Sequence, residues 1–94
     1  MRLIEKIYEV ERKYTEELIG RIKKEGYVLK ESGIEDIPPG FYPMEILKRE
    51  RVAGYYDESF GCGIFISNLE TREGKNLDRI LLNFLNRKEM DRYR

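Results

Sequence analysis

Few side chains in this sequence can perform chemistry near neutral pH. Its 94 residues include no His and no Trp, and Cys62 is the single cysteine, whereas Lys, Arg, Asp and Glu make up 38% of the chain. Imidazole is the side chain that most often moves protons or binds metals at this pH. A cysteine nucleophile needs a neighbouring base or a positive field, and no His can supply one. We therefore expect a protein that is not an enzyme and that holds no metal or cofactor.

The remaining reactive groups do not change that expectation. Cys62 alternates with Phe60, Ile64 and other apolar residues, which is typical of a buried and inert thiol. Paired carboxylates can hydrolyse glycosides or bind divalent cations. Here the pairs are adjacent residues, such as Asp57 and Glu58, and adjacent side chains on a strand or a helix point in different directions.

Side chains near the C-terminus could read nucleic acid. An amphipathic helix is predicted over 77–91, with Leu81 and Phe84 on its apolar side and Asn76 as a candidate N-cap. Arg and Asn form paired hydrogen bonds with guanine and adenine in the major groove of DNA. Four such residues fall on the polar stripe of this helix: Arg79, Asn83, Asn86 and Arg87.

The charge balance weakens the nucleic-acid hypothesis. The chain has 18 basic and 18 acidic residues and a net charge of zero, whereas a general polyanion binder is normally basic. Asp78, Glu89 and Asp91 lie in the same segment and would repel phosphates. A solvated helix face explains the same pattern without any ligand. A small nucleic-acid-binding regulator is therefore the second hypothesis of function.

The aromatic content supports the first hypothesis, which is binding to protein. Seven Tyr and four Phe are more rings than a core of this size is expected to shelter. Aromatic residues, Tyr especially, are enriched where proteins meet. We expect a non-enzymatic interaction or regulatory module that forms a homodimer and can also bind another protein. The candidate contact residues are Tyr8, Tyr14 and Tyr55.

Hydrophobic periodicity places these residues on elements. Leu3, Ile7 and Val10 open a 3–4 spacing that predicts a long helix over 2–25. Three prolines and two glycines in 31–43 predict a loop, and 43–50 fits either a short helix or a strand. Strands over 51–67 are predicted to form a hairpin whose loop is Asp57–Ser59, so that Tyr56 would face Phe60.

These elements predict one α+β domain over 1–94, with two layers. The domain has a long N-terminal helix, a two- or three-stranded antiparallel sheet with the 51–67 hairpin, and a C-terminal helix, and both helices cover one face of the sheet. The N-terminus lacks the apolar segment of a signal peptide, and no run is long enough to cross a membrane. We expect a cytoplasmic protein. High Glu, Lys and Arg without Gln favours a thermophilic source.

Overall fold

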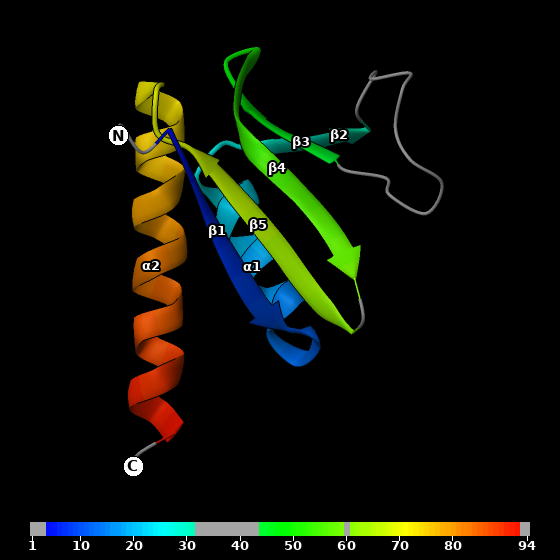
Figure 1. Cartoon of the computed structure of the whole chain (residues 1–94), viewed down its shortest axis with the longest axis vertical. Coiled ribbons are helices and arrows are strands. Elements are labelled where there is room, and N and C mark those ends of the chain that lie inside the picture. The colour runs from blue at the N-terminus through cyan, green and yellow to red at the C-terminus, as the bar shows by residue number, and fades with distance from the viewer. Residues whose placement is uncertain (1–3, 32–43, 60, 93–94) are drawn as a thin grey trace.

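The described part of the chain is a two-layer structure of five strands and two helices (Figure 1). The computed structural model describes residues 4–31, 44–59 and 61–92. All strand pairs are antiparallel, and the strand order is β1-β5-β4-β3-β2. The elements along the chain are β1 (Glu5–Glu11), α1 (Arg12–Lys24), β2 (Val28–Glu31), β3 (Met44–Lys48), β4 (Arg51–Ser59), β5 (Cys62–Asn68) and α2 (Arg72–Arg92).

Both helices pack on the same face of the sheet, where they form the core. Strand side chains alternate between two faces, and Val10, Phe65 and Ile46 are buried on the face that the helices cover. A Cβ on Gly63 would meet α1 at 2.8 Å, and a Cβ on Gly54 would meet α2 at 2.9 Å. The helices contribute Leu18, Ile22, Leu77, Leu81 and Phe84 to the core. In the residues that the structure describes, the other face of the sheet carries no helix.

The predicted helix over 2–25 is wrong, because its first part is a strand. β1 pairs with β5 along seven residues, and its Tyr8 and Val10 are buried in strict alternation with exposed neighbours. Apolar residues at 3, 7 and 10 fit a helical spacing, but the Ile7–Val10 run also fits a period of two and is rich in β-formers. Pairing with β5, more than fifty residues away in sequence, decides between the two patterns.

The two- or three-stranded sheet is wrong for a related reason. β1 adds one edge strand, and β2 with β3 adds two more on the other side, so the sheet has five strands. Residues 44–48, which fit either helix or strand, form β3. The predicted loop over 31–43 lies outside the described residues, except for Glu31, which ends β2.

The 51–67 region forms an antiparallel pair, but its register differs from the predicted one. Ser59 lies opposite Cys62 and Tyr56 opposite Phe65, so the chain reverses between Ser59 and Cys62. Gly61 has a φ of 81°, a left-handed conformation that suits glycine. The predicted register was off by an odd number of residues, which exchanges the two faces of one strand relative to the other. Cys62 consequently lies half-buried on the sheet face without helices.

The C-terminal helix begins five residues before the predicted start. The hydroxyl of Thr71 accepts a hydrogen bond from the backbone N–H of Gly74 at 3.0 Å, which caps the first turn. Gly74 is required there because the turn lies directly on the sheet. A Cβ on it would meet the carbonyl oxygen of Asn68 at 1.7 Å and that of Ala53 at 2.8 Å.

This close approach predicts opposite effects for one substitution in the two helices. Gly74→Ala is expected to destabilise the protein by at least 1–3 kcal/mol, the usual range for overpacking, because backbone atoms cannot yield. Gly20→Ala in α1, where nothing lies within 4 Å of the added Cβ, is expected to stabilise it by about 0.5–1 kcal/mol. Urea unfolding of the two variants measures both changes. Equal stability of Gly74→Ala and the unsubstituted protein would contradict this packing.

Candidate functional site

The four sequence-predicted nucleic-acid residues are all exposed on α2. Arg79, Asn83, Asn86 and Arg87 project away from the core-facing Leu77 and Leu81 side of the helix. Successive residues of an α-helix lie ~100° apart around its axis, so the residues that share one side of α2 can be identified from their spacing in the sequence. We call this side the α2 outer face; it comprises Arg72, Lys75, Asn76, Arg79, Leu82, Asn83, Asn86 and Arg87.

The α2 outer face contains no carboxylate. Asp78 lies on the flank toward β1, where it accepts a hydrogen bond from the Tyr8 hydroxyl at 2.6 Å. The side chain of Glu73 is only 13% exposed, whereas Glu89 is exposed and lies seven residues after Leu82, so it borders this face just beyond Arg87. Of the acidic residues that weaken the nucleic-acid hypothesis in the sequence, Asp78 therefore points elsewhere, Glu89 borders the C-terminal end of the face, and the side chain of Asp91 lies outside the described part of the structure. Arg72 was missed in the sequence because the helix was predicted to start at 77.

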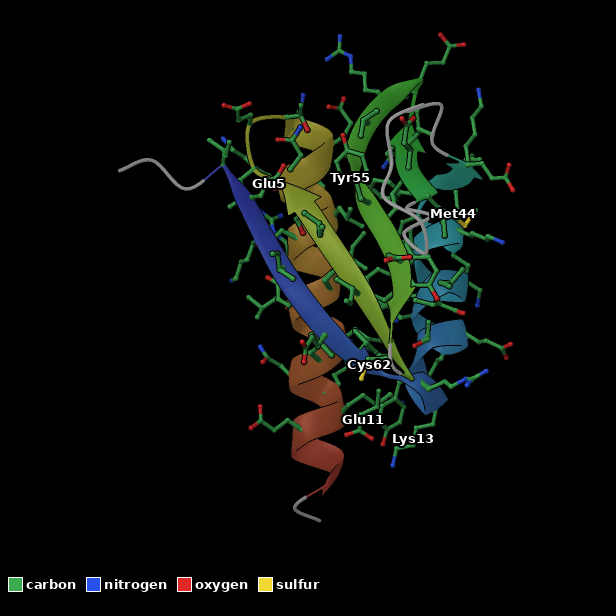
Figure 2. All side chains as sticks on the ribbon, turned by 45° about the vertical axis from the view of Figure 1, so that its right-hand side comes forward. Glu5, Glu11, Lys13, Met44, Tyr55 and Cys62 are labelled. Atoms are coloured by element: carbon green, nitrogen blue, oxygen red, sulfur yellow. The ribbon has the colours of Figure 1, made fainter. Side chains whose placement is uncertain are left out.

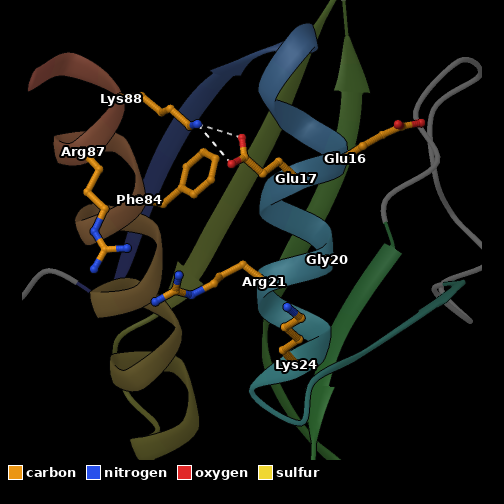
Figure 3. A pocket seen from close by; sticks show the side chains of 8 residues that line it. All are labelled: Glu16, Glu17, Gly20, Arg21, Lys24, Phe84, Arg87 and Lys88. Carbon is orange, nitrogen blue, oxygen red and sulfur yellow. Dashed lines mark hydrogen bonds and ion pairs between the residues drawn. The ribbon is translucent and has the colours of Figure 1, made fainter. Parts of the chain in front are cut away.

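α1 adds two cations beside this face. A groove of about 370 Å³ separates the helices, and Arg21 and Lys24 enter it from α1 while Arg87 enters it from α2 (Figure 3). Lys88 and Glu17 face one another across the groove, 2.8 Å apart (Figure 3). None of the ion pairs found in the described parts of the chain involves Arg21, Lys24 or Arg87.

A second hollow continues the groove toward the start of α2. Its volume is about 170 Å³, and it shares Arg21 and Arg87 with the first groove. Arg79 and Asn83 line it from α2, and Glu25 lines it from the end of α1. Residues of the α2 outer face thus form one wall of both hollows, and α1 forms the other.

The β3–β4 turn places a further basic cluster at the start of α2. A pocket of about 460 Å³ lies there, with Lys48, Arg49 and Arg51 on the turn side. From α2 it is lined by Arg72, Glu73 and Asn76. We call it the turn pocket. The sequence shows the basic run around residue 49, but only the fold brings that run next to Arg72.

The opposite side of the molecule is apolar and acidic. We call the sheet face without helices the outer sheet face. Figure 2 labels Tyr55, Glu5 and Cys62 on it. Ile7 is 64% exposed and Val28 is 61% exposed. By register this face comprises Glu5, Ile7, Glu9, Glu11, Val28, Lys30, Glu45, Leu47, Tyr55, Asp57, Cys62, Ile64 and Ile66.

The net charge of zero therefore conceals a separation of charge. The outer sheet face carries five carboxylates and one Lys, whereas the cations of α1, α2 and the β3–β4 turn gather on the helix side. A uniform distribution would create no directional field, but two oppositely charged sides do. The helix side is the one that favours anions.

The three predicted protein-contact tyrosines lie in different surroundings. Tyr8 is 8% exposed and belongs to the core. Tyr14 is half-buried, with the ammonium groups of Lys13 and Lys88 each 5.0 Å from its ring centre. Only Tyr55 lies on the outer sheet face, opposite Ile66. The structure does not bring the three residues together.

Buried phenols give the fold a dependence on alkaline pH. Burial raises the pKa of Tyr8, Tyr27 and Tyr56, and the neighbouring carboxylates of Asp78, Glu73 and Glu58 respectively raise it further. A group with a raised pKa holds its proton more tightly in the folded protein. Its contribution to stability is complete below the unfolded pKa of about 10 and is lost as the pH rises above that value.

We therefore expect the free energy of unfolding to fall between pH 9 and pH 12. Tyr56→Phe removes one ionisable phenol, because Phe carries no hydroxyl, and should make this fall smaller. Urea unfolding of both proteins at pH 8 and pH 11 measures the difference. An identical loss of stability in the variant would show that Tyr56 does not contribute to it.

Within residues 4–31, 44–59 and 61–92, no group of three or more Asp, Glu or Cys side chains is arranged to hold a metal ion. No helix in the described part of the chain is long and apolar enough to cross a membrane. No protein-family model, curated protein or solved structure matches the chain.

Proposed function

We propose that this protein binds duplex nucleic acid through the α2 outer face. One observation carries the proposal: between Arg72 and Arg87, one side of the helix holds four cations and three Asn with no carboxylate among them, and Glu89 borders only its C-terminal end. From Arg72 to Arg87 this side extends about 22 Å at ~1.5 Å per residue. That length matches about six base pairs, because B-DNA rises ~3.4 Å per pair.

The side chains suit a helix in the major groove. This groove is about 12 Å wide and admits an α-helix, and Arg and Asn are the residues that pair with guanine and adenine edges there. Arg21 and Lys24 lie beside the helix, where they could hold phosphates and set its orientation. The face has no aromatic residue, although proteins that bind single strands usually stack bases on such residues. Duplex binding is therefore favoured over single-strand binding.

The separation of charge supports the same direction of approach. A polyanion is attracted by the cations on the helix side and repelled by the carboxylates of the outer sheet face. Zero net charge lowers non-specific attraction at long range, but it does not prevent binding by a local basic surface. The zero net charge of the chain is therefore no argument against nucleic-acid binding on the helix side.

Salt and substitution test the proposed interface. Arg79→Ala is expected to weaken binding to a fluorescent 16-base-pair duplex about tenfold, because a base contact by Arg contributes about 1–3 kcal/mol. The affinity of the unsubstituted protein should fall steeply with salt, since neutralised phosphates release counterions. Fluorescence anisotropy from 20 to 200 mM NaCl measures both effects.

Lys30→Ala is the matched control for Arg79→Ala. It also removes one positive charge, but from the outer sheet face. Its affinity for the duplex should stay within about twofold of the unsubstituted protein. Equal losses of duplex affinity in the two variants would show that net charge, and not the position of Arg79, determines binding. The absence of binding at 20 mM NaCl would refute the proposal.

A second candidate function is self-association through the outer sheet face. Its support is the row formed by Ile7, Ile66 and Tyr55 on neighbouring strands, together with the exposure of Ile7 and Val28. Exposed apolar rows of this kind are typical of protein contacts. A homodimer that buries this face leaves the α2 outer face available for nucleic acid.

Two charge insertions separate the candidate functions. Ile7→Glu is expected to convert a dimer to a monomer without changing duplex affinity, because Ile7 lies on the outer sheet face. Leu82→Glu puts a carboxylate on the α2 outer face and should weaken duplex binding about tenfold without changing the assembly state. Sedimentation equilibrium and anisotropy measure the two properties. A strict monomer at high concentration would rule out self-association.

A further inference from the structure

The turn pocket has the side chains of an anion site. Four cations line it, and they come from two elements that are separated in the sequence: Lys48, Arg49 and Arg51 from the β3–β4 turn and Arg72 from α2. Glu73 is the one carboxylate among its lining residues, so the pocket has a charge of +3 (four minus one). Arg presents several N–H donors in a fixed fork, which suits the multiple oxygens of a phosphate.

Glu73 adds a second kind of recognition to the pocket. Its Oε1 lies 3.9 Å from a nitrogen of Arg51, whereas its Oε2 is buried and accepts no hydrogen bond from any described residue. A buried carboxylate oxygen without a donor is unfavourable, so a ligand donor that Oε2 reaches by rotation of the Glu73 side chain gains binding energy. A hydroxyl or an amine beside the phosphate would supply that donor.

We propose that the turn pocket binds a phosphate monoester that carries a neighbouring hydroxyl, as nucleotides do. The charge of the pocket favours a monoester, which is close to a dianion at neutral pH, over a singly charged diester. The same chemistry occurs in a free nucleoside monophosphate and in the 5′-phosphate at the end of a nucleic-acid strand. Because Arg72 and Asn76 belong both to the pocket and to the α2 outer face, a strand end bound here could continue along α2.

The conformation of the turn provides a clean test. Arg49 has a φ of 54° and Glu50 a φ of 65°, a left-handed conformation that glycine adopts much more easily than either residue. Arg49→Gly and Glu50→Gly should therefore both raise the melting temperature. Only Arg49 lines the pocket. Arg49→Gly should weaken phosphate binding at least tenfold, whereas Glu50→Gly should leave it unchanged or slightly stronger.

Isothermal titration calorimetry with adenosine 5′-monophosphate, inorganic phosphate and adenosine tests the ligand chemistry. We expect the monophosphate to bind more tightly than inorganic phosphate, and adenosine not to bind. Glu73→Gln should reduce the preference for the monophosphate over inorganic phosphate. Fluorescence anisotropy with 5′-phosphorylated and 5′-hydroxyl duplexes of one sequence tests whether the pocket binds the 5′-phosphate at the end of a strand.

The outcomes separate the two sources and the two proposals. Binding of the monophosphate without a preference between duplex ends assigns the pocket to free nucleotides, and a preference of at least threefold for the phosphorylated end assigns it to strand ends. The pocket proposal is refuted if the monophosphate does not bind and the two duplex ends bind equally well. Equal losses of phosphate affinity in Arg49→Gly and Glu50→Gly would also refute it. Duplex binding that is lost in Arg79→Ala but unchanged in Arg49→Gly would leave the α2 interface standing alone.

Discussion

The contact between the first turn of α2 and the sheet governs the rest of the structure. Gly74 lies against two backbone carbonyl oxygens, and nearby Leu77 packs over Gly54. Because only a residue without a side chain fits against these oxygens, the close contact restricts rotation of the helix. It fixes which residues of α2 face the core, and consequently which residues face solvent over the next four turns. The carboxylate-free side of the helix is a direct result of that fixed rotation.

The one-sided arrangement of the helices turns a neutral composition into a polar molecule. Strand residues on the uncovered face alternate between acidic and apolar types, as in Glu5, Ile7 and Glu9. The helices and the β3–β4 turn carry the basic residues on the other side. Two surfaces with different chemistry can therefore serve two ligands at once. The surfaces lie on opposite layers, so occupation of one does not cover the other.

Local sequence patterns predicted part of this arrangement and could not predict the remainder. The exposed side of α2 followed from helical spacing, because Arg79 and Arg87 need only their own helix to be placed. The N-terminal strand could not be identified with confidence, since its apolar residues fit two periods and the choice depends on distant β5. The capping hydroxyl of Thr71 was a signal in the sequence that marks the start of α2 and brings Arg72 onto the helix.

The hairpin register and the turn pocket are two further features that local sequence patterns did not predict. A register error of an odd number of residues kept the pairing of β4 with β5 but exchanged the faces of the partners, so Cys62 was expected in the core. The turn pocket depends on residues about twenty positions apart, Arg49 and Arg72, which no periodicity relates. Sites assembled across elements require the fold, whereas sites within one helix do not.

The position of β1 at the margin of the sheet has a consequence for solubility. Among the described residues, β1 and β2 are the outermost strands, and each has one side whose backbone groups no neighbouring strand satisfies. Such a margin can recruit strands from other molecules and start fibre growth. Glu5, Glu9 and Glu11 give β1 a negative charge at three of the four positions on its uncovered face, which opposes that recruitment. This margin of the sheet thereby carries its own safeguard against cross-β assembly.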